Sequence, residues 1–328
     1  MKIFVSRKVP GSSLDMLAGS GNEVTISEFD RPLTSEELLE KAKGVDALMS
    51  LLTDKIDGEV LDAIGPQLKI VSNYAVGFDN IKVEDATGRG IVVCNTPCDE
   101  VNEAVAEQTW ALILALTRRI VEADEATRRG AYKGWEPDIF LGHSLSGKTL
   151  GVVGLGRIGT MVARRAAGFG LTILYNKREP DPELEKELGI SFSSLDDLLA
   201  KSDIVSVHVP LTDETKGMFN KEMFNKMKNG VYFVNTARGP IVKEDDLVEA
   251  IRSGHIGGAA LDVYENEPNI HPELIGMENV ILTPHTASAT YEAREKMCEL
   301  AVNAILQTLR GEMPANIVNK DVWPARRK

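Results

Sequence analysis

Three short polar segments late in the chain carry side chains that suit the reduction of a carbonyl group. They contain Arg238, Glu267 and His285, and each follows a strand-like run, at residues 231–235, 258–261 and 280–282. A histidine can donate a proton near neutral pH, and a neighbouring glutamate favours and orients its protonated form. An arginine offers a planar fork that matches a carboxylate. Single residues of these types are more often structural, so they are candidates as a set.

A glycine pattern earlier in the chain indicates a nucleotide. The pattern consists of Gly154, Leu155, Gly156, Arg157, Ile158 and Gly159. It follows a strand-like run and opens a helix-like one, which is the context in which it binds a dinucleotide. The first glycine permits a tight turn, the second lets the backbone approach a pyrophosphate, and the third brings helix against strand. The helix N-terminus then presents N–H groups to the phosphates.

The end of the next strand bears on which dinucleotide binds. An acidic residue that holds the ribose 2′-hydroxyl is expected about 20 residues after the last glycine. At 177 − 159 = 18 residues the chain instead reads Asn176, Lys177 and Arg178. Two cations suit a 2′-phosphate, so the sequence predicts that NADP(H) is preferred. The alternative is a solvated basic turn, with Glu179 or Asp181 at the ribose of NAD(H).

The spacing of apolar residues predicts an α/β protein with two doubly wound parallel-sheet domains. Strand-like and helix-like runs alternate over the first hundred residues and again from residue 148. Alternation of this kind is typical of parallel sheets with helices on both faces. The two domains expected are residues 1–100 with 289–328, and residues 101–288 as an inserted Rossmann domain. A single long helix over residues 101–129 is expected to bridge domains or contact a partner.

Composition narrows the classes of partner. The 328-residue chain has a formal net charge of −12, 43% hydrophobic and 26% charged residues. This acidity argues against nucleic acid and anionic membranes, and no apolar run is long enough to cross a bilayer. The N-terminal residues lack the apolar core of a signal peptide. Three cysteines form no metal spacing and no even disulfide set, which fits a cytoplasmic protein without a metal.

Several motifs in one order resemble the D-isomer-specific 2-hydroxyacid dehydrogenase family. The matching stretches are residues 73–80, 104–107, 147–159, 208–211, 235–239, 260–263, 267–268, 284–285 and 288–290. The resemblance covers nearly the whole chain. It implies a Rossmann cofactor domain inserted into a flavodoxin-like substrate domain, with the substrate in the cleft between them.

The resemblance also implies roles for individual residues. Arg238, Glu267 and His285 would be the catalytic set, and Arg238 and His285 would also contact substrate and cofactor. The backbone of Val76 and Gly77 would bind the substrate carboxylate, with Leu52 lining the pocket. Asp262 would meet the nicotinamide carboxamide. Further cofactor contacts would come from Thr109, Val209, Pro210, Thr236 and Ala237. Family members are typically homodimers joined through the cofactor domain.

Within this family, residues 134–147 resemble the glyoxylate/hydroxypyruvate reductase branch, in which Trp135 approaches the partner subunit's active site. The other interpretation of Trp135 is a packing anchor at the dimer contact. The sequence thus predicts reduction of glyoxylate or hydroxypyruvate to the D-2-hydroxy acid, with His285 as proton donor. A D-3-phosphoglycerate or D-lactate dehydrogenase is the alternative of the same class. A cofactor-regulated, non-enzymatic module resembling corepressors is the remote one.

Overall fold

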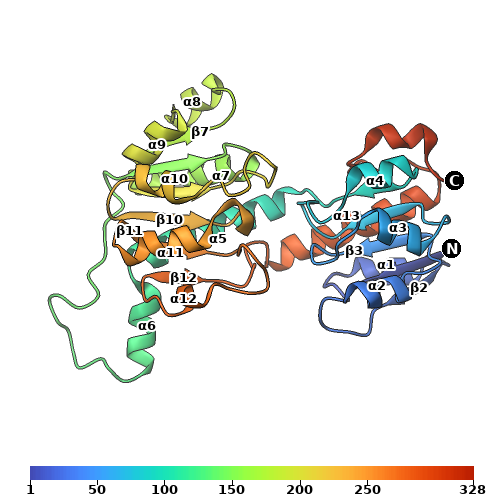
Figure 1. Ribbon diagram of the computed structural model, residues 1–328, viewed down its shortest axis with the longest axis horizontal. Coiled ribbons are helices and arrows are strands. Elements are labelled where there is room, and N and C mark those ends of the chain that lie inside the picture. Colours follow the sequence, from blue (N-terminus) through green and yellow to red (C-terminus); the bar gives the residue numbers. More distant parts are fainter. The chain divides into compact units, whose positions relative to one another are not determined.

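The computed structural model describes residues 1–328, which form two compact units. The first unit contains residues 1–101 and 289–328, and the second contains residues 102–288. Each unit has one sheet in which every pairing between named strands is parallel, with helices packed around it (Figure 1). The predicted α/β class with two parallel sheets is therefore confirmed.

The first unit has a five-stranded sheet in the order β2-β1-β3-β4-β5. Its strands are β1 (Lys2–Val5), β2 (Glu23–Ile26), β3 (Ala47–Ser50), β4 (Ile70–Asn73) and β5 (Val92–Cys94). Its helices are α1 (Ser13–Ala18), α2 (Ser35–Lys41), α3 (Gly58–Ile64), α4 (Val83–Gly88), α13 (Tyr291–Leu309) and the 3-10 helix Lys320–Ala325. Strands β3, β4 and β5 are buried throughout, as expected where helices cover both faces of a parallel sheet.

The last helix belongs to the first unit because it packs against that sheet. Helix α13 contacts β4, and the Ser72 hydroxyl donates a hydrogen bond of 3.0 Å to the carbonyl oxygen of Ala301. Thr290 caps the helix by accepting from the N–H of Ala293. The chain thus returns to its first sheet after completing the second.

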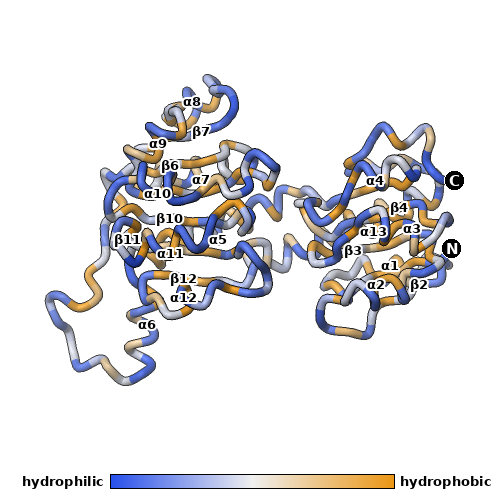
Figure 2. The backbone as a smooth tube through the Cα atoms, viewed as in Figure 1, coloured by the Kyte–Doolittle hydropathy of each residue, from blue (hydrophilic) through white to orange (hydrophobic).

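The second unit has a seven-stranded sheet in the order β12-β11-β10-β9-β6-β7-β8. Its strands are β6 (Thr149–Val153), β7 (Thr172–Asn176), β8 (Ser191–Phe192), β9 (Ile204–Val207), β10 (Val231–Asn235), β11 (Ile256–Leu261) and β12 (Val280–Leu282). The helices are α5 (Asp99–Thr117), which starts in the first unit, α6 (Ile120–Arg128), α7 (Arg157–Ala166), α8 (Pro182–Leu188), α9 (Leu195–Lys201), α10 (Lys221–Lys226), α11 (Glu244–Arg252) and α12 (Pro272–Ile275). Figure 2 shows that apolar residues concentrate along the strands of each sheet.

The strand order places a ligand crevice in this unit. The chain runs from β6 outward to β7 and β8, and then returns to place β9 on the other side of β6. Ligands of open α/β sheets bind outside the carboxyl ends of the strands where the order reverses. In this sheet that position is the adjacent ends of β6 and β9. The glycine pattern begins there, at Gly154.

The expected single helix over residues 101–129 is wrong. The structure has two helices, α5 and α6, separated at Arg119, which adopts a left-handed conformation with φ 54°. The loop that returns at residue 143 explains where the first helix ends. The carbonyl oxygen of Thr117 accepts a 2.8 Å hydrogen bond from the backbone N–H of His143, and the Thr117 hydroxyl donates back to the carbonyl oxygen of Ile113. Both contacts satisfy polar groups at a helix terminus.

The sequence pattern also missed two of the four edge strands, β2 and β8. Strand β2 alternates between exposed and half-buried residues, and β8 has two residues, both exposed. Short edge strands of this kind bury too little apolar surface to show in a hydrophobic pattern. No helix in the chain is both long enough and apolar enough to cross a membrane.

Two glycines of the cofactor pattern make a matched test of the fold. A Cβ on Gly159 would collide with the carbonyl oxygen of Gly154, whereas a Cβ on Gly156 would have nothing within 4 Å. We expect Gly159→Ala to lower the free energy of unfolding by about 1–3 kcal/mol, the usual cost of overpacking. Gly156→Ala should change it by less than about 0.5 kcal/mol. Urea unfolding of both variants is the measurement, and equal stabilities would contradict this account.

Candidate active site

The glycine loop after β6 is shaped to receive a phosphate group. Gly154 has φ +100°, and a Cβ there would lie 2.7 Å from the carbonyl carbon of His208 at the end of β9. Gly159 packs α7 against this turn. Gly156, the N-cap of α7, is exposed and has open space on its Cβ side. The backbone at Gly156 is therefore accessible to a pyrophosphate at a helix N-terminus, so the residues present fit a dinucleotide.

The remaining residues of the loop divide between core and surface. Leu155 is buried and packs in the apolar core of the unit, and Ile158 is half-buried against it. The side chain of Arg157 lies exposed at the first position of α7. Arg157 is thus the cation of this loop that solvent or a phosphate can reach.

The two cations after β7, which are the predicted contacts of the ribose 2′-position, each form an ion pair within the protein. Asn176 donates a 2.9 Å hydrogen bond from Nδ2 to the carbonyl oxygen of Ser193. The Lys177 ammonium lies 3.0 Å from Asp181, and the Arg178 guanidinium lies 3.4 Å from Glu214. The two cations are at the end of β7, where the sequence placed them, but each faces a carboxylate.

The other predicted cofactor contacts differ in how accessible their side chains are. Pro210 is exposed and Val209 is half-buried. Thr109 is fully buried, and its hydroxyl lies 2.9 Å from that of Thr236, which is 7% exposed. In this conformation Thr109 therefore supports the loop after β10 rather than presenting its hydroxyl to solvent.

His208 lies beside the glycine turn as a neutral ring. Its Nε2 lies 2.8 Å from the hydroxyl of Ser206, and burial lowers the pKa of His208 to about 4. At pH 7 this histidine is uncharged and adds no positive charge at the crevice.

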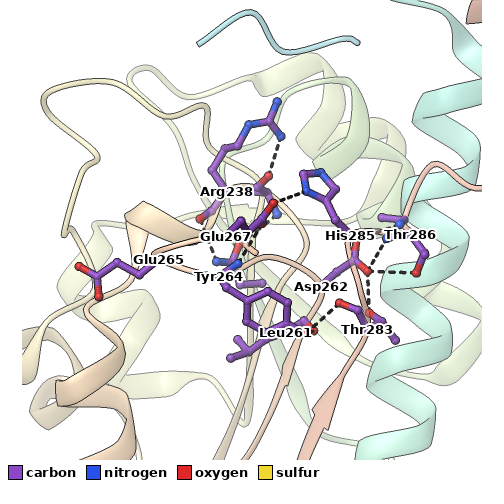
Figure 3. A network of polar contacts seen from close by, with 12 residues as sticks. Arg238, Leu261, Asp262, Tyr264, Glu265, Glu267, Thr283, His285 and Thr286 are labelled. Carbon is purple, nitrogen blue, oxygen red and sulfur yellow. Dashed lines mark hydrogen bonds and ion pairs between the residues drawn. The ribbon is translucent and has the colours of Figure 1, made fainter. Parts of the chain in front are cut away.

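The three candidate catalytic residues follow β10, β11 and β12, which are neighbours in the sheet. Figure 3 shows the side chains of Arg238, Glu267 and His285 close together. His285 Nδ1 lies 2.9 Å from Oε2 of Glu267, and the two side chains are 26% and 31% exposed. Oε1 of Glu267 accepts a 3.0 Å hydrogen bond from the backbone N–H of Tyr264. The structure thus brings the predicted glutamate and histidine into direct contact.

The charge state of Glu267 follows from its surroundings. Burial alone would raise the pKa of Glu267, but the hydrogen bond and charge of His285 outweigh it, with smaller contributions from the Tyr264 N–H and Arg238. The pKa of this carboxyl group therefore lies below its ordinary value. Because an ionised carboxylate can only accept, Nδ1 of His285 is the donor, and Nε2 is left for another partner.

Arg238 lies in the loop after β10, and its charge acts on the Glu267 carboxylate. One guanidinium nitrogen donates a 2.8 Å hydrogen bond to the carbonyl oxygen of Ala237, and the side chain is half-buried. Gly239 lets this loop touch the next one, because a Cβ there would collide with the backbone of Tyr264. The arginine and glutamate loops are therefore packed backbone to backbone.

Asp262 organises the histidine loop. It is fully buried, and its backbone carbonyl oxygen accepts a 2.9 Å hydrogen bond from the N–H of His285. Its carboxylate accepts from the Thr283 hydroxyl at 2.6 Å, the N–H and hydroxyl of Thr286 at 2.8 and 3.3 Å, and the N–H of Ala287 at 2.8 Å. His285 has φ 54°, a backbone conformation that is costly for this residue unless its surroundings enforce it. The family resemblance implies that Asp262 contacts the nicotinamide carboxamide. In this structure its carboxylate accepts these hydrogen bonds from the loop of His285.

A reciprocal pair of glutamates, which the sequence did not reveal, holds the loop of Glu267. The carboxylate of Glu244 at the start of α11 accepts from the N–H of Glu265 at 2.8 Å, and the carboxylate of Glu265 accepts from the N–H of Glu244 at 3.1 Å. Lys243 adds an ion pair to Glu265 at 3.1 Å. Burial raises the pKa of Glu244. The one available signal was an acidic first turn, which many helices share.

The predicted substrate residues of the first unit lie at the end of β4. The carbonyl oxygens of Val76 and Gly77 accept hydrogen bonds from the side-chain amides of Asn95 at 2.7 Å and Asn73 at 3.0 Å. Within the first unit, the N–H groups of Val76 and Gly77 donate to no acceptor. Leu52 follows β3 in the sequence, and its side chain is 37% exposed. Two fixed and unpaired N–H groups suit a carboxylate.

Trp135 lies in the segment of residues 129–147, which has no helix or strand. Its side chain is 84% exposed and makes no ring contact with the rest of the chain. The structure therefore does not bring Trp135 to the catalytic residues of its own second unit.

Comparisons with known proteins agree over the whole chain. A family model described as "D-isomer specific 2-hydroxyacid dehydrogenase, NAD binding domain" matches residues 110–287. The chain is 48% identical to a glyoxylate reductase of Thermococcus onnurineus, over 99% of this chain and 98% of that one. It is 50% identical to a glyoxylate reductase of Thermofilum pendens, over 99% and 96%. The crystal structure of the TT0316 protein from Thermus thermophilus matches with a TM-score of 0.90 at 43% identity, over 97% of this chain and all of the other.

Proposed function

The chain belongs to the D-isomer specific 2-hydroxyacid dehydrogenase family, and we propose that it reduces glyoxylate or hydroxypyruvate to glycolate or D-glycerate. The observation that carries the proposal is the His285–Glu267 pair beside Arg238, in the unit that holds the glycine loop. The family binds a nicotinamide cofactor through this domain. The similarity to glyoxylate reductases at 48% and 50% identity favours this activity over that of a D-3-phosphoglycerate or D-lactate dehydrogenase.

Each residue has a defined task in this proposal. The bound nicotinamide supplies the hydride that reduces the keto carbon. Arg238 binds the carboxylate of the keto acid through its planar guanidinium group. His285 donates the proton from Nε2 to the carbonyl oxygen, because its Nδ1 is engaged by Glu267. Glu267 orients the ring and stabilises its charged form.

The two cations after β7 support NADPH as the preferred donor. Lys177 and Arg178 stand where NAD-dependent enzymes carry an acid that holds the ribose. A 2′-phosphate gains from both charges, whereas a bare ribose finds no carboxylate at these positions.

The exposed apolar residues of the second unit support a homodimer as the assembly. No residue of α6 is buried, and Ile120 and Val121 are 52% and 48% exposed. In the segment that follows, Trp135 and Leu141 are 84% and 66% exposed. Figure 1 shows this helix and segment extending away from the sheet of their unit. Covering such a patch with the same patch of a second copy would bury it. In such a dimer, Trp135 would approach the active site of the partner subunit.

The proton donor is tested by removing the imidazole. His285→Ala should lower kcat for glyoxylate reduction by about 10²- to 10⁴-fold, the usual share of general acid catalysis, while the Kd for the cofactor stays within about twofold. The matched control is His271→Asn, which removes another histidine of the same unit and keeps a good N-cap for α12. Near-normal turnover in His285→Ala would rule out the assignment.

Glu267 is tested through the pH profile. In Glu267→Gln the side chain no longer carries the negative charge that favours a protonated ring. We expect kcat for reduction to decline at a lower pH than in the unchanged enzyme, because the proton donor loses its proton earlier. An unmoved profile would show that Glu267 does not act on His285.

Cofactor preference is tested with a panel of 2-keto acids against NADPH and NADH. We expect higher kcat/KM with NADPH, and we expect Lys177→Ala and Arg178→Ala each to lower kcat/KM for NADPH while leaving that for NADH nearly unchanged. Higher kcat/KM with NADH, unaffected by either substitution, would reverse the proposed preference. Turnover of any 2-keto acid also excludes the non-enzymatic alternative.

The assembly is tested by sedimentation. The unchanged chain should have the mass of two copies, and Val121→Glu with Leu141→Glu should have the mass of one. Ile275→Glu is the control, since Ile275 is 65% exposed in the same unit but lies on α12. Trp135→Ala should raise KM for the keto acid without changing the mass. A single-copy mass for the unchanged chain would contradict the homodimer.

A further inference from the structure

Asp181 is the most firmly positioned side chain beside the two cations. Its Oδ1 caps α8 by accepting from the N–H of Leu184 at 3.2 Å. Its own backbone N–H donates a 2.7 Å hydrogen bond to the hydroxyl of Tyr175, whose side chain is fully buried in the core. Asp181 is therefore anchored at the backbone by a core residue and at the side chain by a helix end.

The second carboxylate oxygen of Asp181 faces Lys177. Oδ2 lies 3.0 Å from the Lys177 ammonium, and the side chains of Lys177 and Asp181 are 31% and 29% exposed. The hydrogen bond from Lys177 lowers the pKa of Asp181. The carboxylate is thus ionised at neutral pH, and the charge of Lys177 is already compensated inside the protein.

Arg178 is held far less firmly. Its side chain is 89% exposed, and its partner Glu214 is 80% exposed at 3.4 Å. An exposed pair of this kind contributes little and rearranges easily. A 2′-phosphate can therefore recruit Arg178 at little cost, whereas it can recruit Lys177 only against the negative charge of Asp181.

We propose that Asp181 is a specificity-determining residue whose fixed carboxylate weakens the preference for NADP(H) over NAD(H). The inference rests on the proposed function, in that it places the ribose of the dinucleotide at the end of β7. The Asp181 carboxylate makes the choice between NADP(H) and NAD(H) less strict than the two adjacent cations alone would make it. The carboxylate repels a 2′-phosphate and at the same time neutralises the nearer cation.

The test is isothermal titration of the full chain with NADP⁺, NAD⁺, 2′,5′-ADP and 5′-AMP. Asp181→Asn removes the charge and retains the helix cap, because asparagine is as good an N-cap as aspartate. We expect the Kd for NADP⁺ and for 2′,5′-ADP to fall by about three- to tenfold, which is the effect of a unit charge about 4 Å from a phosphate charge when water screens both. The Kd for NAD⁺ and 5′-AMP should stay within about twofold. Asp181→Ser, also a good cap, should behave alike.

Two further variants isolate the mechanism. Asp197→Asn removes the same charge from another i,i+4 pair, Lys201–Asp197 on α9, and should leave all four constants unchanged. Lys177→Ala combined with Asp181→Asn should lose most of the gain in NADP⁺ affinity, because the freed ammonium is absent.

Three results would overturn the inference or its basis. Weaker NAD⁺ binding in Asp181→Asn, with NADP⁺ unchanged, would mean that Asp181 holds the ribose hydroxyls. Unchanged constants for all four ligands would mean that it has no part in selection. An unchanged chain that binds neither dinucleotide would contradict the proposed function itself.

Discussion

The catalytic geometry depends on one buried carboxylate, that of Asp262. This side chain follows β11 and collects hydrogen bonds from Thr283, Thr286 and Ala287 in the loop after β12. These bonds fix the segment in which His285 adopts a positive φ. A backbone conformation of this kind persists only where its surroundings over-determine it. Without Asp262, the imidazole would not be held at the Glu267 carboxylate.

A second set of contacts holds the other half of the pair. Glu244 and Glu265 cap each other's backbone N–H groups, and Tyr264 donates its N–H to Glu267. Both carboxylates of the reciprocal pair act as acceptors for backbone groups that a loop would otherwise leave unpaired. The position of Glu267 is therefore fixed both by the backbone hydrogen bonds of its loop and by the hydrogen bond to its carboxylate. Preorganisation of this kind keeps reacting groups in place before a substrate arrives.

Patterns that depend on local spacing were predictable from the sequence. Strands β10 and β12 have the predicted bounds, because the apolar pattern that marks a strand is local. The grouping of Glu267 with His285 came from the chemistry of a proton donor and from the family resemblance, and the structure places the two side chains in contact. The break at Arg119 could not be predicted, since it depends on a loop that returns from residue 143.

Contacts between distant residues account for the rest of what sequence reasoning missed. The Glu244–Glu265 pair joins residues 21 apart, and no periodic signal marks either one. The sequence showed that Lys177 was a cation at a strand end, but not that Asp181 already held it. Patterns of residue type give position along an element, whereas pairing depends on how the elements pack.

The most direct test of the central claim is ¹⁵N NMR of the enzyme with labelled histidine. If Glu267 accepts from Nδ1 of His285, then the neutral ring should carry its proton on Nδ1 and leave Nε2 unprotonated. Glu267→Gln should shift that resonance and leave the signals of the other histidines unchanged. A neutral His285 protonated on Nε2, and insensitive to Glu267→Gln, would contradict the account.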